Sequence, residues 1–293
     1  MHTARSLSSN TLIKVWRHNP AMSSISQVND RAAAPAAAIS TRAPYIVAFA
    51  VFVCAASVTL YFNYSMLGGM PMPGNWTMSM MWMPMASDLE AAVMFTGMWL
   101  AMMVAMMLPS TLPMLLLYRR AAAFRGERHL GWMMFVLGSA YFFVWTLFGI
   151  VTYLAGLTIA RAAMHSDVFS RTLPLADGLA LCVAGIYQLT PWKSACLKHC
   201  RDPLALVAGH LHRGIFGALR LGLHHGAFCA ACCWALMLIQ LVLGVMNLTV
   251  MLAVAVVIAL EKLLPKGEWV AKATGVAAIG AGAVLVALSL RSL

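Results

Sequence analysis

The chain has 293 residues, of which 62% are apolar and 10% are charged, and its net charge is +11. Soluble domains contain about 45–50% apolar and about 25% charged residues, so this composition excludes an ordinary soluble enzyme. Methionine is unusually frequent, with 23 residues, and seven cysteines and nine histidines complete the supply of soft metal ligands. The basic charge could suggest nucleic acid, but its distribution along the chain has another cause.

Seven apolar runs predict an all-α polytopic transmembrane helix bundle of six or seven spans. They cover residues 45–62, 91–117, 131–160, 174–190, 226–246, 248–264 and 273–290. A spanning helix needs about 17–25 residues, and lipid cannot satisfy an open backbone, so runs this apolar are expected to be helical. The runs at 174–190 and 248–264 are at the short limit, which leaves open whether they cross fully.

The basic residues predict the orientation. If the N-terminus is cytoplasmic and all seven runs cross, 17 of the 20 Lys and Arg residues fall on the cytoplasmic side. This asymmetry follows the positive-inside rule and explains the basic balance with no nucleic-acid partner. Residues 1–43 are interpreted as a disordered cytoplasmic tail, or as the product of a start codon assigned too far upstream. Residues 44–293 form the predicted transmembrane domain.

A methionine-rich segment, residues 63–89, is predicted on the outer side between the first two helices. Residues 66–85 contain eight methionines and no Lys, Arg, Asp or Glu, and their prolines and glycines argue against a regular helix. Thioether sulfur is a soft, uncharged ligand that suits Cu(I). The alternative is an interfacial loop that inserts Met and Trp among lipid headgroups. The candidate ligands here are Met70, Met72, Met78, Met81, Met83 and Met85.

The second helix continues the methionine pattern. Ser87 and Glu90 have the spacing of a capping box that would begin this helix. Met94, Met98 and Met102 follow at intervals of four residues, so they share one helical face. Pro109 is expected to kink the helix. These methionines form either a ladder for a soft metal ion or ordinary packing filler.

Cysteine and histidine concentrate in residues 191–233, which is the predicted inner segment. Five of the seven cysteines lie there, in two helical rows that could face each other. Four such ligands would suit tetrahedral zinc or a Cu(I) site of lower coordination number, and an iron–sulfur cluster remains open. The alternative is that these cysteines pack like alanine. Copper is the favoured metal, with zinc or iron as alternatives. The candidate ligands are Cys196, His199, Cys200, His225, Cys229, Cys232 and Cys233.

Three polar residues lie within or beside apolar runs, namely Gln188, Asn247 and Glu261. Such groups are expected to face the interior of a bundle. Glu261 could pair with Lys262 or Lys193 or assist proton coupling, or it could mark a charged helix end that reaches water.

Three sequence blocks carry a resemblance to a known family. They are WLAMMVAMMLPS at 99–110, YQLTPWKSACLKHCRDP at 187–203 and GLHHGAFCAACCWALM at 222–237. Together they resemble a bacterial family of uncharacterised proteins described as predicted metal-binding integral membrane proteins, over residues 90–290. Ala231 stands where that family has a Gly before its Cys-Cys pair. The resemblance implies metal binding in a bacterial cytoplasmic membrane but supplies no metal and no mechanism.

The leading functional hypothesis is the binding, transport or delivery of a soft metal ion. Outer methionines would capture Cu(I), Met98 and Met102 would pass it on, and the Cys/His residues would receive it. The expected partners are the lipid bilayer, the ion and a possible metallochaperone or metalloenzyme. The alternative is a membrane-embedded, metal-dependent redox enzyme that acts on a small hydrophobic substrate or quinone. No nucleophile–base pair or phosphate loop supports hydrolysis or phosphoryl transfer.

Overall fold

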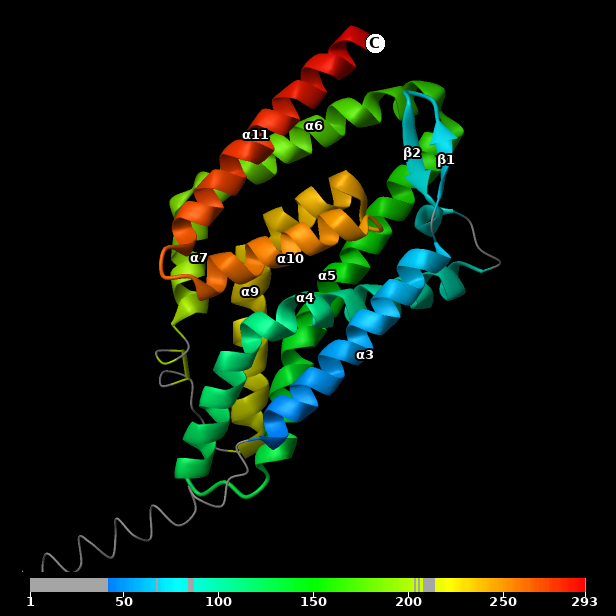
Figure 1. The fold of residues 1–293 in the computed structure, drawn as a ribbon. Coiled ribbons are helices and arrows are strands. Elements are labelled where there is room, and N and C mark those ends of the chain that lie inside the picture. The colour runs from blue at the N-terminus through cyan, green and yellow to red at the C-terminus, as the bar shows by residue number, and fades with distance from the viewer. Residues whose placement is uncertain are drawn as a thin grey trace, which may run out of the picture.

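The computed structural model describes residues 42–66, 68–83, 87–202, 204, 206–207 and 214–292. Within these ranges the chain forms eight α-helices and one two-stranded hairpin (Figure 1), which confirms the predicted all-α class. Six of the helices are long and apolar enough to cross a membrane, which indicates an integral membrane protein. These six are α3 (Ala43–Ser65), α4 (Asp88–Phe124), α5 (Leu130–His165), α6 (Asp167–Leu189), α9 (Gly214–Gly244) and α11 (Gly267–Ser292).

The two short apolar runs have different outcomes. The run at 174–190 belongs to α6, a helix of 23 residues that begins after Ser166, whose hydroxyl accepts a hydrogen bond from the Phe169 N–H. The run at 248–264 forms α10 (Leu248–Leu263), which has only 16 residues. At about 1.5 Å per residue, a helix of this length is shorter than the bilayer core of about 30 Å. A further short helix, α7 (Pro191–Arg201), follows α6 directly.

Helix α4 is too long to cross a bilayer as a straight rod. It has 37 residues and contains Pro109 and Pro113. Each proline removes a backbone hydrogen bond and crowds the preceding turn. Figure 1 shows α4 changing direction along its length, in agreement with the predicted kink. The predicted cap is also present, because the Ser87 hydroxyl accepts a hydrogen bond from the Glu90 N–H at 3.1 Å.

The methionine-rich segment folds as a hairpin rather than a helix, as its prolines and glycines predicted. Strands β1 (Gly69–Met72) and β2 (Trp76–Ser79) pair antiparallel, and the 3₁₀ helix η1 (Met80–Trp82) follows. The turn contains Gly74 and Asn75, which both have positive φ. Trp76 Nε1 donates to the backbone oxygen of Ser170 at 3.1 Å, and Ser170 Oγ donates to the Pro73 carbonyl at 2.7 Å. These bonds fix the hairpin to the beginning of α6.

Helices α6 and α11 run side by side and approach most closely through paired glycines (Figure 1). Gly178 faces Gly282 and Gly185 faces Gly275, and the spacing of seven residues repeats on both helices. A Cβ at Gly282 would lie 2.6 Å from the Gly178 carbonyl oxygen. Small residues allow membrane helices to approach at backbone distance, and these four therefore fix the crossing.

The main buried cluster lies where α4, α5, α9 and α10 meet, and most of its members are Met, Cys or aromatic residues. The described chain therefore places buried methionines of α4 and cysteines of α9 in one side-chain cluster. Residues 1–41 of the predicted tail, and Met85 of the outer segment, lie outside the described residues.

Candidate metal centre

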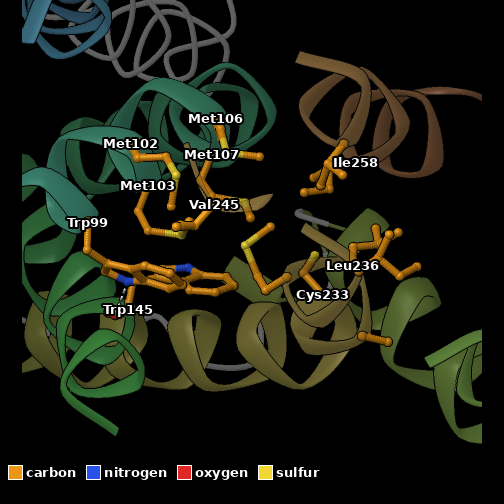
Figure 2. Close-up of a cluster of buried hydrophobic side chains, with 14 of the residues drawn as sticks. Trp99, Met102, Met103, Met106, Met107, Trp145, Cys233, Leu236, Val245 and Ile258 are labelled. Atoms are coloured by element: carbon orange, nitrogen blue, oxygen red, sulfur yellow. Dashed lines mark hydrogen bonds between the residues drawn. The ribbon is translucent and has the colours of Figure 1, made fainter. Parts of the chain in front are cut away.

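Buried methionine and cysteine side chains gather in the main cluster of the bundle. Helix α4 contributes five buried methionines and α9 contributes three cysteines with no exposed surface, all in one cluster. Figure 2 shows Met102, Met103, Met106 and Met107 reaching from α4 toward the side of the cluster that holds Cys233. We call this group the sulfur cluster; its members are Met98, Met102, Met103, Met106, Met107, Cys229, Cys232 and Cys233.

The cysteines of the sulfur cluster form a row of interacting thiols rather than a ring. Cys229 interacts with Cys233, Cys233 with Cys232, and Cys232 with Cys200 on α7. Among the described residues, no three His, Cys, Asp or Glu side chains converge on a point that could hold a metal ion. Thiols in a row offer pairs of soft ligands, and each pair can be completed by a thioether from α4.

Cys229 has two polar neighbours outside the row of thiols. Its Sγ lies 2.9 Å from the Tyr141 hydroxyl and 2.9 Å from Lys262 Nζ. Lys262 Nζ also lies 3.9 Å from Met107 Sδ. Two polar groups from α5 and α10 therefore meet at this one sulfur atom.

The cysteines occupy the middle of a span rather than its start. The apolar run predicted a helix from residue 226, which would place Cys229 in its first turn. Helix α9 begins at Gly214 instead and has 31 residues. Gly222 and Gly226 let this extended helix pack closely on the backbone of α5 at Leu137 and Tyr141. The sulfur cluster is therefore buried at depth within the bundle.

The other predicted ligands of the 191–233 segment lie at the junction of α7 and α9. Cys196 and Cys200 are half-buried and pack against the sulfur cluster. The His199 ring lies 5.2 Å from the His224 ring, and Phe228 contacts both. His225 instead stacks on Tyr141 at 5.3 Å. The neighbour of His199 across this junction is thus His224, which the sequence pattern did not single out.

The outer methionines differ strongly in burial. Met78 is 1% exposed, and Met72 is also buried; both pack on Ala160 and Ala163 near the end of α5. Met81 is buried and belongs to the same cluster as Met98, so it connects the hairpin with the sulfur cluster. The remaining candidates are nearer the surface: Met70 and Met94 are exposed and Met83 is half-buried.

Two of the three predicted interior polar residues form a buried network. Glu261 accepts a hydrogen bond from Gln188 Nε2 at 3.0 Å and pairs with Lys193 Nζ at 2.7 Å. The sequence predicted either Lys262 or Lys193 as the partner of Glu261, and the structure has Lys193 in this position. Asn247 differs from the expectation, because it is exposed and caps α10, accepting hydrogen bonds from the backbone N–H groups of Thr249 and Val250.

Lys193 connects this network to the cysteine helix. Its Nζ donates to the Cys232 carbonyl at 2.8 Å. Burial by itself lowers the pKa of Lys193, but the thiols of Cys232 and Cys233 and the Glu261 carboxylate outweigh it and raise the pKa above its usual value. The lysine therefore stays charged at neutral pH, and its charge is compensated by Glu261.

Three residues of the site were not predicted from the sequence. Gln240 Nε2 donates a hydrogen bond to Met102 Sδ at 3.1 Å. Gln240 lies on the same helical face as Cys229 and Cys233, and this spacing is a sequence signal for its place in the site. The sequence indicates Lys262 only as a partner for Glu261, yet its Nζ contacts Cys229 Sγ. Tyr141 lies in a long apolar run of α5, and no local pattern distinguishes it from other aromatic residues there.

The fold and this centre define a helical membrane protein with a buried, sulfur-rich site. A family model named PpoB2 and described as a copper chaperone matches residues 96–285, which is more than half of the chain. The chain therefore belongs to the PpoB2 copper chaperone family. The matched range contains the whole sulfur cluster together with Lys193, Glu261 and Lys262. No curated protein and no solved structure matches the chain.

Proposed function

We propose that this protein is a membrane copper chaperone that binds Cu(I) in the sulfur cluster and passes it between α4 and α9. The observation that carries the proposal is that the methionine row and the cysteine row belong to one buried cluster. Thioether and thiolate sulfur are the protein ligands that favour Cu(I). Membership in a copper chaperone family supports copper over zinc or iron.

The types of sulfur ligand support a Cu(I) affinity that increases from the methionines to the cysteines. Met81 of η1, Met98 and Met102 of α4, and Cys229 and Cys233 of α9 all belong to one buried cluster. Neutral thioethers hold a cation less tightly than anionic thiolates do. An ion moving through a membrane site needs binding that is favourable but readily reversed, and a series of thioethers supplies it.

The proposed setting is a bacterial cytoplasmic membrane, with the N-terminus in the cytoplasm and the hairpin outside. Figure 1 supports this arrangement, because the hairpin and the α4–α5 connection lie at opposite ends of the molecule. The α4–α5 connection carries Arg125 and Arg128, as the positive-inside rule requires of a cytoplasmic loop. The half-buried Cys196 and Cys200 on α7 would then be the ligands nearest to a cytoplasmic metallochaperone or a metalloenzyme that exchanges copper with this protein.

The experiment that tests the proposal is metal analysis of the protein purified in detergent without oxygen and loaded with Cu(I). Stoichiometric copper is expected in the parent, and loss of copper in a variant with Ser at Cys196, Cys200, Cys229, Cys232 and Cys233. Cys54→Ser is the matched control, because Cys54 faces outward from α3, away from the cluster. No copper in the parent would contradict the proposal, and iron in its place would favour a membrane redox enzyme.

A second variant distinguishes the contribution of the methionine row to copper loading from that of the cysteine row. Replacing Met98, Met102 and Met103 with Leu keeps the volume and apolarity of the core but removes three sulfur atoms. If the methionines deliver the ion to the cysteines, this variant should bind the same amount of copper at equilibrium but load it more slowly. An unchanged loading rate would show that these methionines only pack.

A further inference from the structure

Lys262 lies at the boundary between the methionine row and the cysteine row. Its Nζ is 2.9 Å from Cys229 Sγ and 3.9 Å from Met107 Sδ, so one ammonium group contacts the last α4 thioether of the sulfur cluster and the first thiol of α9. Its neighbour Glu261 points the other way, toward Lys193 and Gln188. Two adjacent residues of α10 therefore serve different parts of the site.

The half-buried ammonium of Lys262 has unusual surroundings for a lysine. Among the described residues, no carboxylate forms an ion pair with it, and the pairs found in this part of the chain are Arg161–Asp88, Lys193–Glu261 and Lys198–Glu268. The polar groups that face the Lys262 ammonium are instead sulfur atoms and the Tyr141 hydroxyl, which contacts the same Cys229 thiol. Lys262 is half-buried, and the nearest polar partners of its ammonium are these soft ligands.

We infer that Lys262 is a gate residue, whose ammonium occupies the position that Cu(I) must cross between Met107 and Cys229. This inference rests on the proposed function. Two cations at this spacing repel each other, because solvent screens a half-buried ammonium less than a fully exposed one. Copper can bind Met107 and Cys229 together only when the Lys262 side chain has moved away. The lysine thus weakens copper binding and lets the ion be given up again, as a chaperone requires.

The test compares Cu(I) affinity in variants that remove or keep the charge. Lys262→Met replaces the ammonium with a side chain of similar length, and Lys262→Gln removes the charge without adding a sulfur. Affinity is measured by competition with the chromogenic Cu(I) chelator bicinchoninate, on the full chain in detergent without oxygen. We expect about tenfold tighter binding in both variants. Lys262→Arg keeps the charge and is expected to bind no tighter than the parent.

A purely structural role for Lys262 predicts the opposite result. A damaged core would weaken copper binding, so tighter binding in Lys262→Met and Lys262→Gln cannot arise from misfolding. Unchanged or weaker Cu(I) binding in both neutral variants would overturn the inference that Lys262 is a gate, even if the parent binds copper and the proposed function stands. If neither the parent nor any variant binds Cu(I), the proposed function and the gate fail together.

Release kinetics give a second readout. If the ammonium competes with copper for its position, copper should leave Lys262→Met more slowly than the parent when excess bicinchoninate is added. Lys262→Arg should release copper at least as fast as the parent. Equal release rates in the parent and Lys262→Met would contradict the inference.

Discussion

Lys193 Nζ lies 2.7 Å from Glu261 Oε2, and the two side chains are 0% and 1% exposed. This pair joins α7 to α10 beside the cysteine helix, and the same ammonium holds the Cys232 carbonyl. Taking two charges out of water is expensive, and Gln188 adds a hydrogen bond that offsets part of the cost. A buried pair of this kind fixes one arrangement of three helices around the thiols.

Removing one partner of this pair should destabilise the protein strongly. We expect Glu261→Gln or Lys193→Met to lower the free energy of unfolding in detergent by about 3–5 kcal/mol, because each leaves a buried charge uncompensated. The double variant Lys193→Met with Glu261→Gln should lose less than the sum of the two single losses. The measurement is reversible unfolding followed by tryptophan fluorescence.

The matched control for the buried pair is the exposed pair Asp88–Arg161, whose side chains are 80% and 50% exposed. Asp88→Asn should change the free energy of unfolding by less than about 1 kcal/mol, since exposed ion pairs contribute little. Equal losses for Glu261→Gln and Asp88→Asn would show that the buried pair is solvated and does not organise the helices.

The glycines between α6 and α11 give a second prediction. A Cβ at Gly282 would lie 2.6 Å from the Gly178 carbonyl oxygen and 2.7 Å from Cys182 Sγ, whereas a Cβ at Gly280 would meet nothing within 4 Å. Gly282→Ala should therefore destabilise the protein by about 1–3 kcal/mol, as overpacking does. Gly280→Ala should be neutral or stabilise the helix by up to about 1 kcal/mol. Thermal unfolding of both variants under identical conditions provides the measurement, and similar shifts in both would contradict the close crossing.

Much of the architecture could be predicted from the sequence, because apolar runs of spanning length have few structural solutions. The cap at Ser87 and the kink at Pro109 depend only on residues nearby in the sequence, so both features of α4 were predictable. The start of α9 was not predictable, because Gly214 lies well before the apolar run. A basic, glycine-containing turn of helix resembles a loop in the sequence. That error placed Cys229 at a helix end instead of in the middle of the bundle.

The contacts of the candidate site were less predictable than its ligands. Helical spacing grouped Met98 with Met102 and Cys229 with Cys233, but it could not show that the two rows meet. The partners of Cys229 come from α5 and α10, far away in the sequence, and depend on how these helices pack. The pairing of Glu261 with Lys193 instead of Lys262 is likewise a consequence of the tertiary arrangement.

The hydroxyl of Tyr141 gives a third prediction. It lies 2.9 Å from Cys229 Sγ, so Tyr141→Phe removes one hydrogen bond from the sulfur and leaves the ring in place. If Cys229 binds copper as a thiolate, the variant should bind Cu(I) about fivefold more weakly, corresponding to a hydrogen bond of about 1 kcal/mol. Competition with bicinchoninate gives the affinity.

Tyr153→Phe is the control for Tyr141→Phe. Tyr153 is also a buried tyrosine of α5, but within the described part of the chain its hydroxyl has no hydrogen-bond partner. This variant should keep the affinity of the parent. Equal effects of the two substitutions would show that the Tyr141 hydroxyl does not act on Cys229.

The hairpin methionines provide a fourth prediction, which does not depend on copper. Met70 and Met78 are paired directly across the two strands, yet Met70 is 38% exposed and Met78 is 1% exposed because it packs on α5. Oxidation to the sulfoxide requires access to the sulfur. Brief treatment with dilute hydrogen peroxide should therefore oxidise Met70 and Met80 well before Met78, as measured by peptide mass spectrometry. Equal rates in the folded protein would mean that the hairpin is not docked, whereas equal rates only after denaturation would confirm that packing on α5 protects Met78.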